Sequence, residues 1–299
     1  MSAAAAIRDY YAAPSPFTAP GRHAAALQAL PRDTARLVEI VQGLALHQYF
    51  AGAYGHEIPA SRLGEAHLRD VEAILDRIVA LDPALLSVAR PVDRRVVGVC
   101  RHHVLLLVAM LRAKGIPARA RVGFGLYFNP GYGEDHWVCE WWDEAAGRWK
   151  LADPQFDAVW RNALNIGHDI LDVPRDRFLT AAEAWERCRT GAADPTTFGI
   201  FQGNLRGLWF VAGNLVRDLA ALNKVEMLPW DSWGAMPGPN AAIGRAELAF
   251  FDNLAALTRE PDVSFATLRR FYDGDARLRV PAMVFNAVRQ QVEPVPLAA

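Results

Sequence analysis

The stretch Gly98-Val-Cys-Arg-His-His-Val-Leu-Leu-Leu-Val-Ala-Met-Leu-Arg-Ala-Lys-Gly-Ile-Pro117 predicts one buried helix around which the chain is organised. No residue from Val104 to Leu111 is polar, so the helix has no solvated face there. Gly115 is placed to end the helix, and Pro117 prevents it from restarting. Cys100 stands at the helix start, where free N–H groups and partial positive charge stabilise a thiolate. We therefore expect Cys100 to be a nucleophile held by this helix.

The composition of the 299-residue chain is that of a globular protein with ample material for a core. It is 52% hydrophobic and 22% charged. Its net charge is −1, so the chain has no excess of positive charge that would attract nucleic acid or an anionic membrane. Polar residues interrupt the most apolar later stretch, 205–222, which excludes a simple membrane-spanning helix. Three widely spaced cysteines make no disulfide framework, and no signal peptide is recognised. The sequence therefore predicts a cytoplasmic protein with reduced thiols.

The first third of the chain predicts a surface arm followed by two helices. Residues 1–31 are rich in alanine and proline, and we expect them to form an extended arm with little structure of its own. A helix is predicted at about 35–50, with Asp33 or Thr34 as its cap, and another from Ser61 to about Leu81.

The pattern after Pro117 changes from helical to strand-like. Strands are predicted at 118–128, 135–142 and 148–152, joined by short turns. Three antiparallel strands that follow a buried helix predict an α+β fold, in which the helix packs against an antiparallel sheet.

The second half of the chain is predicted to add flanking helices. Thr180 and Glu183 form a capping box that leads a helix to Arg189. The further helices are predicted at 202–223, 243–257 and 265–273. No repeat and no Gly/Ser-rich linker interrupts the chain. We therefore expect residues 32–299 to form a single domain, with a catalytic core at about 90–160.

Three residues have the chemistry of a thiol enzyme: Cys100, His136 and Asp153. Thiol catalysis needs a thiolate, a base that holds and returns its proton, and a group that fixes the tautomer of the base. Neighbouring antiparallel strands can set His136 and Asp153 side by side, given some stagger or a bulge. Cys139 and Cys188 are expected to be inert, since a free cysteine is more often a small buried hydrophobe.

Four motifs around these residues occur in a characteristic order. They are Gly98-Val-Cys100, Gly115-Ile-Pro-Ala-Arg119, Asp135-His-Trp137 and Trp149-Lys-Leu-Ala-Asp153-Pro154. The segment 98–157 thus resembles the core of the transglutaminase-like superfamily, the papain-like Cys-His-Asp enzymes. The resemblance implies Cys100 as nucleophile, His136 as general base and acid, and Asp153 as the orienting carboxylate. Many members carry an acidic residue two places after the cysteine, where this chain has His102 and then His103.

Other candidate residues surround this triad. The backbone N–H of Cys100 is expected to form one half of an oxyanion hole, because the first N–H groups of a helix lack internal partners. Gln48, Tyr49 and Tyr54 are open alternatives for the second donor, and Trp137 is a further candidate beside the triad. The candidates for the substrate cleft are His103, Asn204, Arg206, Trp230 and Trp233.

Two sets of residues in the second half of the chain each have two possible interpretations. Five polar residues interrupt the predicted helix 202–223: Asn204, Arg206, Asn214, Arg217 and Asp218. They predict either a half-exposed helix in which Arg217 and Asp218 are solvated, or a polar seam that faces the cleft. Trp230 and Trp233 belong either to a lid or to aromatic packing under a loop.

A zinc site is the main chemical alternative to the thiol enzyme. Cys100-x-x-His103 and His136-x-x-Cys139 have the spacing of two zinc half-sites. Residues 136 and 139 point to opposite faces of a strand, so both cannot reach one ion. We expect neither a metal nor a cofactor.

The sequence thus predicts that Cys100 takes an acyl group from an amide, ester or thioester to form an acyl-enzyme, which is then hydrolysed or passes the acyl group to an amine. The substrate is expected to be peptide-like or a small acyl compound, with no nucleic acid or membrane as partner; the oligomeric state is left open. An amide-forming enzyme of small-molecule biosynthesis and a non-catalytic binding module on the same scaffold are the alternatives.

Overall fold

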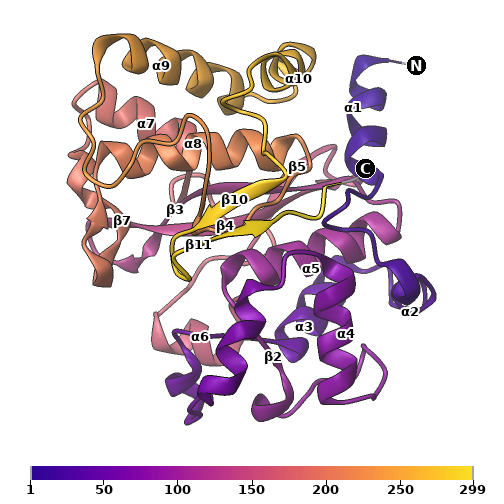
Figure 1. The fold of residues 1–299 in the computed structure, drawn as a ribbon. Helices are drawn as coiled ribbons and strands as arrows, with labels where there is room; N and C mark the ends of the chain where they lie inside the picture. Colours follow the sequence, from indigo (N-terminus) through magenta and orange to yellow (C-terminus); the bar gives the residue numbers. More distant parts are fainter. Residues whose placement is uncertain (1, 298–299) are drawn as a thin grey trace. The chain divides into compact units, whose positions relative to one another are not determined.

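The central element of the computed structural model, which describes residues 2–297, is helix α5 (Cys100–Ala113; Figure 1). Every residue from Cys100 to Arg112 is buried, as the apolar run predicts. Gly115 has a φ of +68°, the left-handed conformation that glycine adopts readily after a helix. The predicted buried helix is therefore confirmed, and its burial extends to the polar residues of its first turn.

The chain folds into two compact units. The described residues of unit 1 are 2–120, 138–173 and 296–297, and those of unit 2 are 121–137 and 174–295. The boundary crosses two long strands, β3 (Ala118–Asn129) and β4 (Tyr132–Asp143), so each strand belongs partly to both units. Helices and strands are mixed, which confirms the predicted α+β class. The single domain over 32–299 stays a prediction.

Unit 1 surrounds α5 with helices from the first third of the chain. Helices α1, α2, α3 and α4 all pack against it. The elements of unit 1 besides α5 are α1 (Ala3–Ala12), α2 (Ala24–Gln28), α3 (Thr34–Leu44), β1 (Ala45–His47), α4 (Val71–Leu81), β2 (Val96–Gly98), β5 (Arg148–Ala152) and α6 (Ala158–Ala163).

The prediction of an extended arm over residues 1–31 is wrong, because this segment contains α1 and α2. Alanine has the highest intrinsic helix propensity, and the segment also buries Tyr11 and Phe17 completely. Arg112, near the end of α5, donates to the Tyr11 carbonyl at 3.2 Å and to Thr18 Oγ1 at 2.9 Å. These contacts hold the segment against the buried helix.

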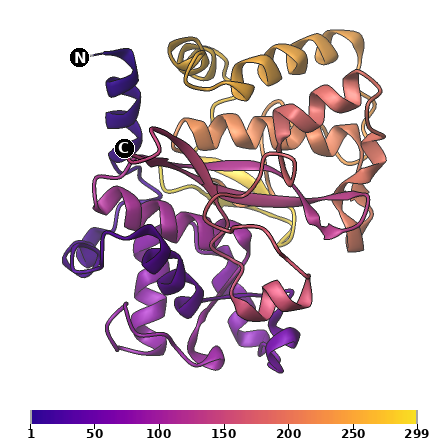
Figure 2. The same ribbon diagram turned by 180° about the vertical axis from the view of Figure 1, so that it is seen from behind.

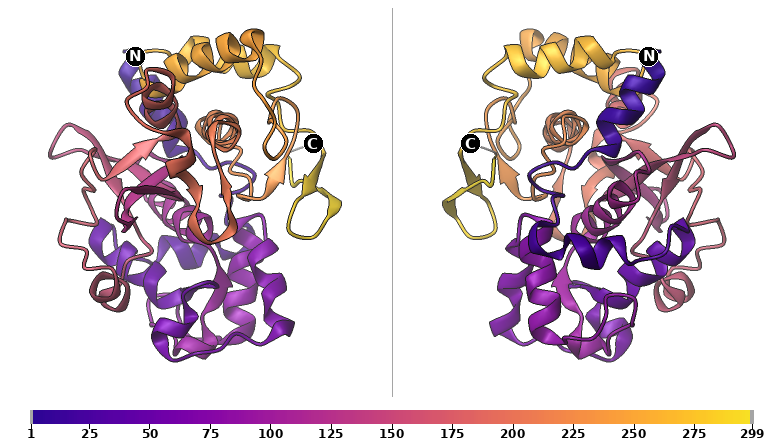
Figure 3. Two further views of the ribbon diagram at one scale, coloured as in Figure 1. Left: turned by 90° about the vertical axis from the view of Figure 1, so that its left-hand side faces the viewer. Right: turned by 90° about the vertical axis from the view of Figure 1, so that its right-hand side faces the viewer.

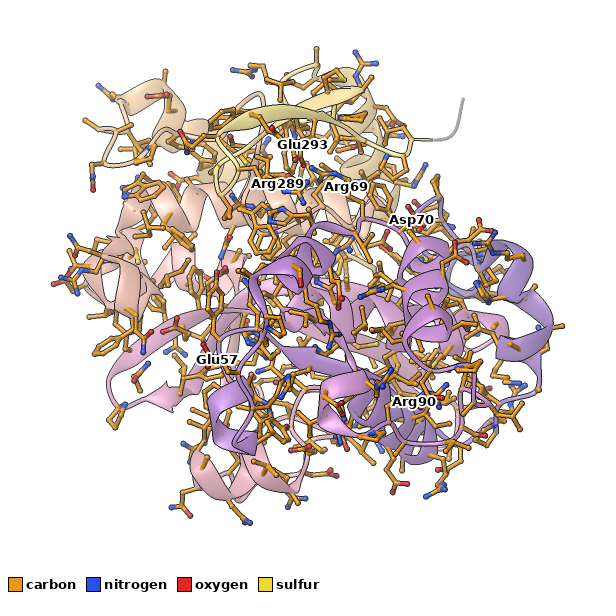
Figure 4. All side chains as sticks on the ribbon, turned by 60° about the horizontal axis from the view of Figure 1, so that its bottom comes forward. Glu57, Arg69, Asp70, Arg90, Arg289 and Glu293 are labelled. Carbon is orange, nitrogen blue, oxygen red and sulfur yellow. The ribbon has the colours of Figure 1, made fainter. Side chains whose placement is uncertain are left out.

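The two helices predicted next are each shorter than expected. Helix α3 has the predicted cap, Asp33, but it ends at Leu44, and β1 follows where a helix to residue 50 was expected. Helix α4 begins at Val71 with Asp70 (Figure 4) as its cap, whose carboxylate accepts the Ala73 N–H at 2.8 Å.

Residues 60–67 form a 3-10 helix instead of the start of α4, and tertiary bonds account for this. The buried Glu65 carboxylate accepts from Arg62, from Arg77 and from the backbone N–H of Val97. Arg62 belongs to the same 3-10 helix, whereas Arg77 and Val97 come from later elements and hold Glu65 in place.

Unit 2 consists of three packed helices, a fourth helix and short strands. Helices α7, α8 and α9 pack on one another, and Figure 3 views α8 nearly along its axis. The predicted Thr180–Glu183 capping box is confirmed at the start of α7. The elements are β6 (Phe178–Thr180), α7 (Ala181–Arg189), β7 (Phe198–Ile200), β8 (Leu205–Arg206), α8 (Leu208–Leu222), β9 (Asp231–Ser232), α9 (Arg245–Arg259), α10 (Phe265–Gly274), β10 (Met283–Asn286) and β11 (Gln291–Pro294).

The predicted helix 202–223 begins only at Leu208. The residues before it form the antiparallel pair β7–β8, with Asn204 in a left-handed conformation at the turn between them. Asn204 and Arg206 are therefore exposed residues of a hairpin and do not interrupt a helix. Strands β9, β10 and β11, which the sequence did not predict, form a separate three-stranded antiparallel sheet.

The main sheet has the strand order β6-β3-β4-β7-β8, with β5 also paired to β4 (Figure 2). The three strands predicted from the sequence correspond to β3, β4 and β5. Gly133 and Glu134 of β4 pair in parallel with β7, whereas residues 139–143 pair antiparallel with β5. Positions 135–138 of β4 lie between these two pairings, and this stretch contains His136.

Unit 2 is fastened by an ion pair that is buried from solvent. Arg121 of β3 donates from Nε and Nη2 to the two carboxylate oxygens of Asp218 of α8, at 3.1 and 2.9 Å. Asp218 also accepts the Val122 N–H at 2.8 Å, and Arg121 donates to the Thr258 carbonyl at 3.0 Å. The interpretation of Asp218 as a solvated helix residue is therefore wrong.

We expect Asp218→Ala to destabilise the protein by about 3–5 kcal/mol, because it leaves the Arg121 guanidinium buried without its counter-charge. Urea unfolding of the purified variant measures this loss. Arg277→Ala, which removes an exposed partner of Asp275, is the matched control and should leave the unfolding midpoint nearly unchanged. Equal midpoints for wild type and Asp218→Ala would contradict the role of this pair.

Candidate functional site

Cys100 is the first residue of α5, and strand β2 leads directly to it. The Val99 cap is extended, so the chain turns from strand to helix at the cysteine. The Cys100 side chain is 7% exposed. The other two thiols lie elsewhere: burial raises the pKa of Cys139 inside β4 well above its usual range, and raises that of Cys188 to about 11. Of the three cysteines, Cys100 is therefore the one that lies at a helix N-terminus.

The two histidines after Cys100 satisfy backbone groups at the helix start. His102 accepts the Val99 N–H on Nδ1 at 3.2 Å and donates from Nε2 to the Leu68 carbonyl at 3.1 Å. His103 donates from Nδ1 to the Val99 carbonyl at 3.1 Å. Both rings are buried, and burial lowers the pKa of His102 well below its usual value. His102 is thus neutral and adds no positive charge beside Cys100.

Gly98 leaves room for the His102 ring. A Cβ on residue 98 would lie 2.7 Å from His102 Cβ and 2.8 Å from its Cγ, closer than such atoms approach. Crowding by the His102 side chain therefore explains why residue 98 of the Gly98-Val-Cys100 motif is a glycine in this chain.

Strand β1 brings one of the three predicted oxyanion donors next to Cys100. His47 pairs with Gly98 in the parallel β1–β2 ladder, and the Gln48 N–H donates to the Gly98 carbonyl at 2.8 Å. Gln48 is thus the next residue along, beside Val99. Tyr49 is 71% exposed.

Tyr54 is engaged elsewhere in unit 1. Its hydroxyl donates to Asp157 Oδ2 at 2.9 Å, and burial together with the Asp157 charge raises its pKa above the usual range. Of the three candidates, Gln48 is the one whose backbone bonds the strand that leads to Cys100.

Asp153 directly follows β5 and is completely buried. Its backbone N–H donates to the Ile170 carbonyl at 2.8 Å, and its Oδ1 accepts the Gln155 N–H at 3.2 Å. The Gln42 side chain donates to the Phe156 carbonyl at 3.1 Å, which ties this turn to α3. Gln155, which the sequence analysis missed, is buried there, and its Oε1 has no hydrogen-bond partner among residues 2–297.

His136 lies in the part of β4 that belongs to unit 2, and it is buried. The Phe128 and Tyr127 rings meet its imidazole edge to face, with centroids 4.9 and 5.9 Å away. Two aromatic rings from β3 thus fix the orientation of the imidazole. Of the predicted triad, Cys100 and Asp153 belong to unit 1 and His136 to unit 2.

The residue before His136 is bound into a polar network that the sequence analysis did not find. Asn214 donates to Asp135 Oδ1 at 2.7 Å and accepts from Arg217 Nη1 at 3.0 Å, while Arg217 Nη2 donates to the Asp231 carbonyl at 3.2 Å. Burial raises the pKa of Asp135 and lowers that of Arg217. Arg217 is thus engaged inside unit 2, and the interpretation of a solvated residue is wrong for it too. The polar residues within the otherwise apolar sequence of α8 were the signal from which this network could have been predicted.

The remaining candidates lie in unit 2 with different exposures. Trp137 is buried, and its indole N–H has no hydrogen-bond partner among residues 2–297. Trp233 is also buried and donates to the Leu278 carbonyl at 3.1 Å, which contradicts a role as a lid. Trp230 is half-buried beside β9. For His103, Asn204, Arg206 and Trp230, contact with substrate stays a prediction.

A metal site and a membrane-spanning helix are two further possibilities. Within residues 2–297, no group of three or more His, Cys, Asp or Glu side chains is arranged to hold a metal ion. No helix in that same range is both long enough and apolar enough to span a membrane.

Residues 85–154 match the family model of the transglutaminase-like superfamily. This segment is thus similar to the core of that superfamily. It runs from before β2 to Pro154 and so contains Cys100, His136 and Asp153, which confirms the resemblance predicted from the sequence. Comparisons with curated proteins and with solved structures give no match.

His102 makes the stability of the transglutaminase-like core depend on pH. Its pKa is lowered in the folded state, whereas an unfolded histidine titrates near 6.5. Below about pH 6.5 the unfolded chain takes up a proton that the folded chain does not, so the free energy of unfolding falls as the pH falls, by up to about 1.4 kcal/mol per pH unit. We expect His102→Gln, which keeps an acceptor for the cap N–H, to reduce this pH dependence. Urea unfolding at about pH 7.5 and about pH 5.5 measures the difference, and an unchanged pH dependence would count against the neutral buried ring.

Gly98→Ala should cost about 1–3 kcal/mol of stability, since the new methyl group overlaps the His102 ring. Thermal unfolding gives the measurement. Gly52→Ala is the matched control in unit 1, because nothing lies within 4 Å of the added Cβ there. The steric explanation fails if both variants melt like the wild type.

Proposed function

We propose that this protein is a cysteine-dependent enzyme that transfers or hydrolyses an acyl group through an acyl-enzyme on Cys100. The observation that carries the proposal is the place of Cys100. It heads a buried helix inside the segment that matches the transglutaminase-like superfamily, next to N–H groups that stabilise negative charge. The substrate is a peptide-like or small acyl compound.

The strand register supports His136 as the base and Asp153 as the group that orients it. Strand β5 ends at Ala152, which pairs with Cys139 of β4, and Asp153 is the next residue. His136 precedes Cys139 by three positions on the same strand. The order of residues along β4 and β5 thus supports the pairing that the proposal assigns to His136 and Asp153.

The reaction begins with transfer of the Cys100 proton to His136. The sulfur attacks the substrate carbonyl carbon, and the tetrahedral intermediate expels an amine, alcohol or thiol that takes the proton from His136. Water or an amine then attacks the thioester carbonyl, again giving its proton to His136, and the Cys100 sulfur leaves. Asp153 holds the imidazole in the tautomer that these transfers require.

The oxyanion of both tetrahedral intermediates is bound by the Cys100 N–H. This group lies in the first turn of α5, where N–H groups have no partner within the helix. Gln48 is the second donor in this proposal, since its backbone already bonds the residue two places before Cys100.

Thiol reactivity provides the first test. We expect iodoacetamide at about pH 7 to alkylate Cys100 at least about tenfold faster than an unactivated thiol such as that of glutathione, because thiolate reacts and a free cysteine has a pKa of about 8.5. Peptide mass mapping locates the label, and Cys188 serves as the internal slow thiol. His136→Ala should remove most of the rate advantage.

A second measurement addresses the acyl-enzyme itself. Incubation with a small-molecule fraction of a cell lysate should add an acyl mass to the wild type and none to Cys100→Ala. A Cys100 that alkylates no faster than glutathione and that carries no acyl group would favour a non-catalytic binding module.

A further inference from the structure

Three side chains follow one another along one face of β4 inside unit 2. Tyr132, Glu134 and His136 are alternate residues of the strand, and alternate residues share a face. The charge of His136 is among the influences on the Glu134 carboxyl, so the two groups are close. Glu134 is therefore next to the proposed catalytic base.

Glu134 is a half-buried carboxylate that lacks a cationic partner. Its oxygens accept the Phe201 N–H at 3.2 and 3.3 Å, and Oε2 accepts the Asn129 amide at 3.3 Å. No lysine or arginine within residues 2–297 forms an ion pair with it. Burial, followed by the neighbouring charge of Asp135, raises the pKa of Glu134 to about 7. The His136 charge opposes this rise of the Glu134 pKa and the Arg206 charge acts on the neighbouring Tyr132, but neither forms an ion pair with Glu134, so the carboxylate would gain from a positive charge bound directly to it.

The hydroxyl of Tyr132 is a second unsatisfied group beside this carboxylate. Tyr132 is only 6% exposed, and its hydroxyl has no hydrogen-bond partner among residues 2–297. After burial, the Glu134 charge is the largest influence that raises the pKa of Tyr132, to about 12, so hydroxyl and carboxylate are neighbours. A buried hydroxyl without a partner costs free energy, which a bound polar group can recover.

Exposed apolar side chains stand next to these polar groups. The Phe201 ring meets the Tyr132 ring edge to face at 5.2 Å, yet half of Phe201 is open to solvent, as is much of Leu205 on the next strand. An exposed aromatic face beside a carboxylate is suited to a cation with an alkyl stem, since the ring attracts the charge and the apolar surface covers the stem. A neutral donor gains less from the carboxylate, and an anion is repelled.

We propose that Glu134 and Tyr132 bind a cationic group of the substrate, an alkylammonium or a guanidinium, two residues from His136. Glu134 accepts a charge-assisted hydrogen bond, the Tyr132 oxygen accepts another, and the Phe201 ring covers the cation. This inference rests on the proposed function, because only an enzyme has a substrate. It adds to that function a preference for positive charge in the acyl group or in its acceptor. Glu134 is a specificity residue and takes no part in the bond-forming steps.

Acylation of Cys100 by three p-nitrophenyl esters of similar length tests the preference. We expect the 6-aminohexanoyl ester to acylate on the order of tenfold faster than the hexanoyl ester, and the adipoyl ester to be slowest. In Glu134→Gln the ratio of aminohexanoyl to hexanoyl rates should fall to about one. Glu39→Gln, an exposed carboxylate in unit 1, is the control and should keep the wild-type ratio. Hexanoyl acylation without any preference for the amino ester overturns an acyl-donor cation site, while the proposed function stands.

A binding measurement separates failure of this inference from failure of catalysis. The side-chain carbon of Glu134 is followed by NMR during a pH titration of the full chain with saturating n-butylammonium, n-butylguanidinium or n-butanol. A bound cation lowers the Glu134 pKa from about 7 by about one unit or more, because an opposite charge favours the carboxylate. A lowered pKa in the absence of any ester reaction supports the cation site alone. An unchanged pKa with both cations refutes it.

Discussion

A helix buried on every side must satisfy the polar groups of its first turn within the protein, and the rest of unit 1 depends on this constraint. Strand β2 delivers the chain into α5 at Val99, whose N–H and carbonyl are bonded by His102 and His103. Those two histidines take the role that an acidic or amide side chain commonly has at a helix start. His102 is neutral there, and the helix N-terminus adds its partial positive charge at Cys100.

The same requirement shapes the part of β4 that carries His136. Burying this strand against α8 takes Asp135, Asn214 and Arg217 out of water, and each is bonded to the next. The Arg121–Asp218 pair does the same between β3 and α8. Networks of this kind are costly when broken and permit few arrangements when complete, so they fix β4 where the imidazole must be held.

Strand β4 changes its partner along one edge, and His136 lies where the change occurs. It pairs with β7 at Gly133 and Glu134 and with β5 from Cys139 onward, so His136 lies on the stretch between them. In the reaction we propose, that stretch carries the general base. The Glu134 carboxylate at the end of the β7 pairing then sets the charge of the group accepted nearby.

The sequence by itself determined the elements whose signals are local. The apolar run to Leu111 with Gly115 after it specified α5, the alternation after Pro117 specified three strands, and Thr180 with Glu183 specified a helix start. The motifs also identified the superfamily, because they combine fixed spacing with rare residue types. Tertiary structure decided the remaining elements, since their conformation and burial depend on partners that are distant in the sequence. Ala45–His47 became a strand by pairing with β2, Ala3–Ala12 and Ala24–Gln28 became helices that pack against α5, and Asp218 was buried by an arginine nearly a hundred residues away.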